Sequence, residues 1–259
     1  MTTPRTPQCQ PGGEMASVHR SVSAPWQYAL IIPALNEEKS IGRLLELVSR
    51  GRFVEIIVVD NGSADGTARV AAANGVRAIL EPRRGYGQAC LTGIAGLGPR
   101  SDAVAFMDAD LSDDPTDLAR LLDAFESSGA DLVIGSRVLG HREPGSLTPL
   151  QRFGNWLSTR LILLIWNVRY TDLGPLRVVS REALRRMALT DRDFGWTAEM
   201  QAMAAKLGMR VAEIPVSYRR RIAGKSKVSG TLMGSLRAGV KILTTIAKCW
   251  LFRKAEKPV

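Results

Sequence analysis

The chain has 259 residues, of which 45% are hydrophobic, which suits one large α/β domain with a buried core. The net charge of +10 arises in residues 219–259, which hold eleven basic side chains and one acid, so we expect this segment to meet an anionic partner. Three widely spaced cysteines and only two histidines argue against a disulfide framework or a zinc site and favour a reducing cytosol.

The two ends of the chain differ in composition from its centre. Residues 1–27 are rich in Pro, Ser, Thr, Gly and Gln without a continuous apolar stretch, which predicts a disordered leader rather than a secretory signal. No segment has the roughly 18 uninterrupted apolar residues of a membrane-spanning helix. We therefore expect a cytoplasmic protein, soluble or peripheral on the cytoplasmic face of the membrane.

Strands and helices are predicted to alternate from residue 29 to about residue 137. Apolar, β-branched runs predict strands at 29–33, 54–59, 76–80, 103–107 and 131–137. Helical periodicity predicts helices at 38–49, 66–74, 87–96 and 115–127. This alternation indicates an α/β fold with a mainly parallel sheet.

The pattern is less regular after the fifth predicted strand. Residues 138–149 are rich in Gly, Pro and charge and predict a mobile loop. The apolar run 157–168 is compatible with a core helix, an interfacial helix or a dimer contact. A turn at 171–177 then leads to a short strand and to a helix from Arg181.

The last predicted element is an amphipathic basic helix at 230–252. It either packs on the domain with a solvated basic face or attaches to anionic lipid. We thus divide the chain into a leader at 1–27, an α/β domain at 28–228 and a basic helix and tail at 229–259.

Polar side chains follow three of the predicted strands. Asn36 and Glu37 follow the first strand, Asp60 ends the second, and Asp108 and Asp110 follow the fourth. Because parallel strands end at one edge of a sheet, where α/β folds bind ligands, we expect these groups to lie together. Carboxylate oxygens suit Mg²⁺ or Mn²⁺, which bridge to substrate phosphates. The aspartate pair is therefore a candidate metal site, the alternatives being a solvated loop or a helix cap.

A glycine-rich segment lies between the third and fourth predicted strands. Residues 83–88 read Arg-Arg-Gly-Tyr-Gly-Gln. Glycine permits close approach of the backbone to a ligand, and arginine suits a diphosphate. We expect Arg84 and Gln88 to contact such a group.

The chain contains a series of motifs, of which the first three include the residues above. In chain order the motifs are Pro33-Ala-Leu-Asn36-Glu37-Glu38, Val-Val-Asp60-Asn-Gly-Ser-Ala-Asp65-Gly-Thr67, Asp108-Ala-Asp110, Gly135-Ser-Arg137, Asp172-Leu-Gly-Pro-Leu-Arg177, Trp196-Thr-Ala-Glu199-Met-Gln201 and Tyr218-x-x-Arg221-x-x-Gly224-x-Ser226-Lys227. Taken together, these motifs resemble those of family-2 glycosyltransferases with a GT-A fold, and the later ones are similar to the polyprenyl-phosphate (dolichyl-phosphate) sugar transferase branch. The resemblance spans roughly residues 29–230 and implies a Rossmann-like, mixed but mainly parallel sheet flanked by helices.

The resemblance implies an inverting enzyme that moves glucose or mannose from a UDP- or GDP-sugar, UDP-glucose being favoured, to a polyprenyl or dolichyl phosphate. It implies that Asp108 and Asp110 hold Mg²⁺ or Mn²⁺. Pro33, Asn36 and Glu37 would line the nucleotide pocket, although Asn36 and Glu37 could equally cap the next helix.

The resemblance also assigns roles to residues outside the metal motif. Asp60 would hydrogen-bond the base or ribose. Glu199 would act as a base, or as a structural or metal-linked carboxylate if the acceptor is a phosphate, which is already ionised at neutral pH. The remaining residues would bind the phosphates of donor or acceptor: Arg137, Arg152, Arg221, Ser226 and Lys227. For Arg152 the alternative is a surface salt bridge.

Two other functions remain open at this stage. One is a soluble transferase of the same fold with a small phosphorylated or hydroxylated acceptor. The other is a nucleic-acid binder built on residues 219–259, which is disfavoured because that segment lacks interleaved stacking aromatics. We expect no nucleic acid, and a lipid acceptor would be reached through an anionic membrane surface or a membrane partner protein.

Overall fold

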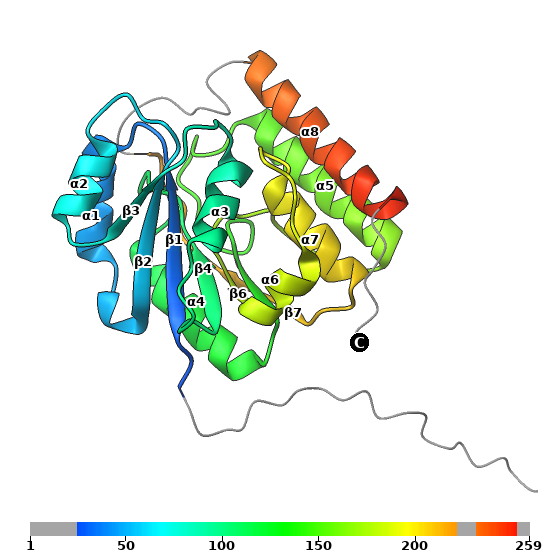
Figure 1. Cartoon of the computed structure of the whole chain (residues 1–259). Coiled ribbons are helices and arrows are strands. Elements are labelled where there is room, and N and C mark those ends of the chain that lie inside the picture. The colour runs from blue at the N-terminus through cyan, green and yellow to red at the C-terminus, as the bar shows by residue number, and fades with distance from the viewer. Residues whose placement is uncertain (1–24, 222–231, 253–259) are drawn as a thin grey trace, which may run out of the picture.

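The computed structural model describes residues 25–221 and 232–252. At its centre is a seven-stranded sheet with helices on both faces (Figure 1). The strand order is β3-β2-β1-β4-β6-β5-β7, in which β6 runs antiparallel to both of its neighbours and every other pair is parallel. The prediction of a mixed, mainly parallel α/β sheet is confirmed.

The elements follow the predicted alternation closely as far as the strand at 132–136, whereas the helix at 196–206 and the strand at 211–215 were not predicted. The first half contains β1 (Tyr28–Ala34), α1 (Glu38–Leu47), the 3-10 helix η1 (Arg50–Arg52), β2 (Phe53–Asp60), α2 (Thr67–Ala73), β3 (Arg77–Leu80), α3 (Tyr86–Ala95) and β4 (Ala103–Phe106). The second half contains α4 (Pro115–Ser128), β5 (Leu132–Ser136), α5 (Pro149–Trp166), β6 (Arg177–Ser180), α6 (Arg181–Met187), α7 (Trp196–Lys206), β7 (Val211–Pro215) and α8 (Leu232–Leu251).

Helix α5 begins earlier than its apolar run at 157–168 indicates. The Thr148 hydroxyl accepts the Gln151 backbone N–H at 3.2 Å, and the Gln151 side chain accepts the Thr148 backbone N–H at 2.8 Å. This capping box, with Pro149 in the first turn, starts the helix at residue 149. The polar first half of the helix concealed its start from a search for apolar periodicity.

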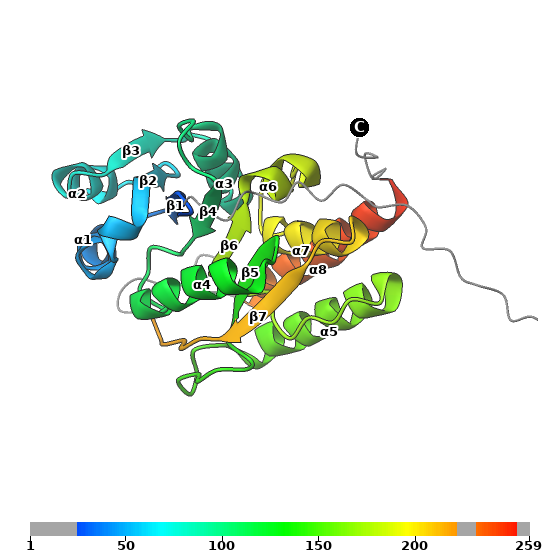
Figure 2. The same cartoon turned by 90° about the horizontal axis from the view of Figure 1, so that it is seen from below.

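The core forms two layers because successive side chains of a strand point to opposite faces of the sheet. On β1, Leu30 and Ile32 pack with α1, α2 and α4, whereas Ile31 packs in the layer formed with α3, α5, α6, α7 and α8. Figure 2 shows the sheet between these two groups of helices. Because β1, β4 and β5 are covered on both faces, they are almost continuously apolar.

The carboxy-terminal helix α8 packs along α5 and α7 (Figure 1). Ala238, Ile246 and Cys249 are buried against them. Its outer side exposes Val240 and Trp250, with exposed fractions of 54% and 56%. No helix in the described part of the chain is both long enough and apolar enough to cross a bilayer.

Candidate active site

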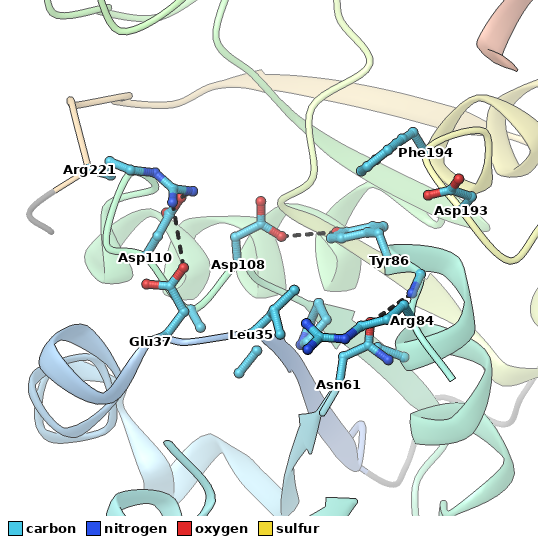
Figure 3. Close-up of a pocket in the computed structure, with 15 residues that line it drawn as sticks. Leu35, Glu37, Asn61, Arg84, Tyr86, Asp108, Asp110, Asp193, Phe194 and Arg221 are labelled. Carbon is cyan, nitrogen blue, oxygen red and sulfur yellow. Dashed lines mark hydrogen bonds and ion pairs between the residues drawn. The ribbon is translucent and has the colours of Figure 1, made fainter. Parts of the chain in front are cut away.

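The main cavity lies at the carboxyl edge of the parallel strands, where β1, β2 and β4 end (Figure 3). Its volume is about 360 Å³. β1 lies between β2 and β4, so the chain leaves β1 toward one side of the sheet and later returns to the other, and ligands of open α/β sheets bind at such a switch point. The polar and aromatic lining residues are Glu37, Asn61, Arg84, Tyr86, Asp108, Asp110, Asp193, Phe194 and Arg221.

Asp108 and Asp110 both line this cavity. Asp108 accepts a hydrogen bond from the Tyr86 hydroxyl at 3.0 Å, and Asp110 accepts the Ser112 backbone N–H at 2.9 Å. Burial and the neighbouring charge of Asp110 raise the pKa of Asp108 to about 7. The negative charge of Asp110 and the loss of water around Asp108 therefore both disfavour the ionised form of Asp108.

Arg221 supplies positive charge to the pair from the segment after β7. Its Nη2 lies 2.5 Å from Asp110 Oδ2, and its Nη1 lies 3.6 Å from Glu37 Oε1. Figure 3 shows the guanidinium reaching between these two carboxylates. Glu37 occupies the N-cap position of α1 but makes no capping hydrogen bond there, and it accepts one from the Ser40 hydroxyl at 2.9 Å instead.

The donor set fits a hard divalent cation that is completed by its substrate. In the part of the chain that the structure describes, no three His, Cys, Asp or Glu side chains cluster to hold a metal by themselves. Mg²⁺ and Mn²⁺ commonly use one or two carboxylates together with water and substrate phosphates. The raised pKa of Asp108 indicates that this site suits a cation, because a cation beside Asp108 and Asp110 would offset the repulsion between the two carboxylates.

The glycine-rich loop forms a second wall of the cavity and is held from below by Asn61. Asn61 Oδ1 accepts the Gly85 backbone N–H at 2.8 Å, and its Nδ2 donates to the Arg83 carbonyl at 2.6 Å. Arg84 is exposed and reaches into the cavity (Figure 3). Arg84 thus places a positively charged side chain in the cavity, at the loop where the sequence analysis expected one.

Gln88 lies behind this loop and does not line the cavity. Its side-chain amide donates to Glu81 Oε2 at 2.8 Å. Hydrogen bonds from Thr92, Gln88 and the backbone of Arg83 lower the pKa of Glu81 to about 2. The geometry thus gives Gln88 a role in fixing the loop, whereas the sequence motif suggested contact with the donor.

Asn36 and Asp60 hold neighbouring loops together at the same edge. The Asn36 backbone N–H donates to the Ser63 hydroxyl at 2.9 Å, and its side-chain oxygen accepts the Ala64 N–H at 2.8 Å. Asp60 accepts the Ser63 N–H at 2.8 Å. Pro33, from the same motif as Asn36, lines the cavity, while Asn36 and Asp60 stand outside its lining.

Arg137 is engaged in a buried ion pair. Its Nε and Nη2 donate to the two oxygens of Asp172 at 2.7 and 2.8 Å. Its guanidinium also lies over the Tyr218 ring, 5.0 Å from the centroid. The ion pair raises the pKa of Arg137 and lowers that of Asp172. Arg137 thus lies outside the lining of the main cavity, and its ion pair with Asp172 joins the loop after β5 to the loop before β6.

Glu199 is also engaged, at the start of α7. One of its oxygens accepts the Thr190 hydroxyl at 2.9 Å, and the other accepts the Asp191 N–H at 2.7 Å. The Thr190 N–H adds a third donor. Glu199 has an exposed fraction of only 2% and does not line the cavity, so the geometry supports the structural alternative for this carboxylate.

Arg152 lines a second cavity of about 600 Å³ beside α5. Four arginines and no acid are among its lining residues, and they share it with Phe153 and Trp156: Arg142, Arg152, Arg160 and Arg169. None of the four forms an ion pair with another described residue, which removes the salt-bridge alternative for Arg152 within that part of the chain. Ser226 and Lys227 lie outside the described residues.

Four of the polar and aromatic lining residues had no role in the motif analysis. Asn61 and Tyr86 belong to the motifs that were noted, at positions given no function, and inspection of those motifs could have found them. Asp193 and Phe194 come from the loop between α6 and α7. No local pattern marks that loop, because only the packing of α7 brings it to the cavity.

The strand order and the cavity at the switch point are those of a GT-A fold. A glucosyl-3-phosphoglycerate synthase from Mycobacterium tuberculosis, in complex with Mn²⁺, UDP and glucosyl-3-phosphoglycerate, shares this fold with a TM-score of 0.70. The match covers 90% of this chain and 83% of that chain at 22% sequence identity, which shows the common architecture.

Residues 29–188 match the family described as glycosyl transferase family 2, and the chain belongs to that family. An uncharacterized glycosyltransferase of Mycobacterium tuberculosis H37Rv is 40% identical over 216 residues, covering 80% of this chain and 92% of that protein. An undecaprenyl-phosphate mannosyltransferase of Micrococcus luteus is 32% identical over 228 residues, covering 79% and 88%. The chain is therefore a glycosyltransferase, as its motifs indicated.

Proposed function

We propose that the protein is a metal-dependent inverting glycosyltransferase that moves glucose or mannose from a UDP- or GDP-sugar to a polyprenyl phosphate. The observation that carries this proposal is the carboxylate pair, Asp108 and Asp110, flanked by Arg221 and Arg84 in one cavity at the switch point. Carboxylates for a cation and arginines for phosphate form a site for a nucleoside diphosphate.

The donor diphosphate is assigned to the main cavity. Asp108 and Asp110 would hold Mg²⁺ or Mn²⁺, and the bound cation would neutralise the charge that develops on the leaving diphosphate. Arg221 already lies 2.5 Å from Asp110 and can turn from this carboxylate to a phosphate oxygen. The solved neighbour with Mn²⁺ and UDP supports a uridine nucleotide, and the mannosyltransferase relative keeps mannose beside glucose as a candidate sugar.

The second cavity supports a phosphorylated lipid as the acceptor. Arg142 pairs through its backbone with Tyr218, in the segment that continues to Arg221, so the two cavities are neighbours. Arg152 and Arg160 are eight residues apart on α5, which is about 12 Å along a helix and too far for one phosphate. We assign the acceptor phosphate to the Arg142 and Arg152 end, and anionic headgroups of the bilayer to the other.

Aromatic side chains favour an acceptor with an apolar chain. Phe153 and Trp156 line the second cavity and are 55% and 52% exposed. A small soluble acid would use the arginines but leave these rings in water. A lipid chain would cover them and gain from the removal of apolar surface from water.

The chemistry proposed for this site requires no general base. A phosphate oxygen of the acceptor attacks the anomeric carbon of the sugar from the face opposite the leaving group and forms the new C–O bond. The bond from that carbon to the diphosphate breaks, its electron pair leaves with the nucleoside diphosphate, and the configuration inverts. A phosphate monoester is largely a dianion at neutral pH, which agrees with a Glu199 whose oxygens are occupied by the loop before α7.

Attachment to the membrane is proposed to be peripheral. α8 exposes Trp250 and Val240 along with Arg237 and Lys248. α5, which lies beside α8, exposes Leu164 to 81%. Apolar and basic side chains on neighbouring helices suit the surface of an anionic bilayer.

The first experiment is a mass-spectrometric transfer assay with Mg²⁺ or Mn²⁺. UDP- and GDP-sugars are offered with a short polyprenyl phosphate, and in a parallel reaction with phosphoglyceric acid, the ligand of a solved neighbour. A glycosylated lipid phosphate is the expected product. Transfer to phosphoglyceric acid alone would retain the donor site and refute the lipid acceptor, whereas no transfer from any nucleotide sugar would refute the donor assignment.

A sedimentation assay with anionic vesicles tests the membrane proposal. The full chain is compared with a chain that ends at Arg221 and is shown by circular dichroism to be folded. We expect only the full chain to sediment fully, with binding that weakens as salt is raised. Equal sedimentation of both chains would show that the carboxy-terminal segment is not the anchor.

A further inference from the structure

The loop of residues 188–195, between α6 and α7, forms one wall of the main cavity with Asp193 and Phe194 (Figure 3). We propose that helix α8 is part of the donor site, because it positions this loop through a single carboxylate, Asp191. Asp191 is thus a positioning residue for nucleotide binding. The proposed effect on nucleotide binding rests on the donor site described above, whereas the effect on the loop does not.

The loop is fixed from beneath by α7. Glu199 accepts hydrogen bonds from the backbone N–H groups of Thr190 and Asp191 and from the Thr190 hydroxyl. Both oxygens of this buried carboxylate are used, so the first half of the loop cannot slide along α7 without exposing a charge to an apolar layer. This attachment reaches residues 190 and 191 but not the two residues that line the cavity.

The loop is fixed from the side by α3. The Gln88 N–H donates to the Arg192 carbonyl at 2.8 Å. A Cβ at Gly85 would lie 2.1 Å from the Arg192 carbonyl oxygen, and one at Gly87 would lie 2.2 Å from that of Asp191. The two glycines therefore allow the loop to sit directly on the start of α3, whereas the sequence had suggested that they admit a diphosphate.

Asp191 completes the attachment by joining the cavity wall to α8. Its Oδ1 accepts the Asp193 N–H at 2.8 Å. Its Oδ2 accepts the Thr245 hydroxyl at 2.9 Å and lies 3.0 Å from Lys241 Nζ. Gly195 permits this contact, because a Cβ there would lie 2.3 Å from the Thr245 hydroxyl and 2.5 Å from Asp191 Oδ2.

One carboxylate thus connects a backbone N–H of the cavity wall to two side chains on successive turns of α8. The Asp191 side chain is 7% exposed and Thr245 is 4% exposed, so water cannot readily replace the lost partners. If the contacts of Asp191 with Lys241 and Thr245 are lost, the carboxylate can rotate, and its hydrogen bond to the Asp193 N–H is no longer held in one direction. The expected consequence is a looser wall and weaker binding of the nucleotide.

The test compares the wild type with the double variant Lys241→Met, Thr245→Val, which keeps the shape of both side chains and removes both donors. Thr244→Val is the matched control, since it removes a hydroxyl from the exposed side of the same helix, where that hydroxyl donates to the Lys241 carbonyl at 2.9 Å. The single variant Lys241→Arg retains a charged donor at this position and should show the same loop exchange and nucleotide affinity as the wild type. Circular dichroism and thermal unfolding establish that every variant is folded.

The first readout is hydrogen exchange of the peptide at 189–195 in the absence of nucleotide. Loss of charge-assisted hydrogen bonds should raise its exchange rate about tenfold in the double variant and leave the control unchanged. The second readout is calorimetric binding of UDP, and in parallel of GDP, with Mn²⁺. We expect the dissociation constant to rise about tenfold. In turnover, the KM for the donor should rise while kcat stays within twofold.

The outcomes separate this inference from the proposed function. If the wild type binds UDP or GDP, an unchanged nucleotide affinity in the double variant would overturn the role of α8. Unchanged hydrogen exchange of the loop in the double variant would overturn it as well. If the wild type binds neither UDP nor GDP, the donor assignment falls, and hydrogen exchange alone decides whether α8 positions the loop. A drop in kcat with an unchanged donor KM would also contradict the inference.

Discussion

Replacing Asp108 by Asn should make the metal-free fold more stable at neutral pH. The substitution removes one of two neighbouring negative charges, keeps the shape of the side chain and leaves an oxygen to accept the Tyr86 hydroxyl. Burial and the charge of Asp110 raise the pKa of Asp108 from 3.8 to about 7. An acid whose pKa is higher in the folded protein than in the unfolded chain takes up a proton on folding, so the free energy of unfolding falls as pH rises between those two values.

The magnitude follows from the size of this shift. Each pH unit between the two pKa values lowers the free energy of unfolding by at most about 1.4 kcal/mol, and between pH 5 and pH 7 the sum is roughly 2 kcal/mol. The Asn variant lacks this dependence. Its stability relative to the wild type should therefore rise by roughly 2 kcal/mol over that interval, while groups common to both proteins cancel in the difference.

The assay is urea unfolding of both proteins at pH 5 and pH 7 with a chelator present. Asp123→Asn, at an aspartate whose side chain is 66% exposed, controls for the loss of a charge elsewhere. Adding Mn²⁺ at pH 7 should stabilise the wild type and leave the Asp108→Asn variant unchanged, because only an ionised pair binds the cation well. A stability difference that is the same at both pH values would refute the argument that the pair is electrostatically strained.

The other predictions concern three separate sites. Asp110→Asn is expected to lower kcat by at least about 100-fold with little change in thermal midpoint, and near-normal turnover would refute the metal assignment. Arg152→Gln should raise the KM for the acceptor about tenfold without changing that for the donor, as measured by titrating each substrate separately; equal changes in both would contradict a separate acceptor cavity. Asp172→Asn should lower the free energy of unfolding by about 3 kcal/mol in urea because it leaves Arg137 buried without its partner, and a loss below about 1 kcal/mol would contradict the burial of that pair.

The strands and helices up to β5 were accessible from the sequence because their signals are local, whereas α7 and β7 were not predicted. Buried parallel strands are short apolar runs, and the helices between them show a 3.6-residue period. The beginning of α5 was missed because its first turns are polar and its start depends on a capping box at Thr148. The antiparallel direction of β6 was not predicted, since a strand of four residues has no pattern that distinguishes its orientation.

The candidate site was partly accessible for the same reason. Asp108 and Asp110 reach the cavity because a strand of a parallel sheet ends directly before them. Asp60 is the last residue of β2 and lies at the same edge, yet it accepts a hydrogen bond from the Ser63 N–H. A polar side chain at a strand end can serve a ligand or a neighbouring loop, and the choice depends on how close that loop lies. Sequence spacing contains no such distance.

The sequence by itself determined the alternation of strands and helices up to β5, the edge of the sheet at which the polar motifs gather, and the basic character of the final helix. These properties depend on residues within a few positions of one another. The tertiary structure alone decided which partner each polar group has. Arg221 meets Asp110 across 111 residues, and Asp191 meets Thr245 across 54. Hydrogen bonds act over about 3 Å and in fixed directions, so only the packed positions of distant elements can select them.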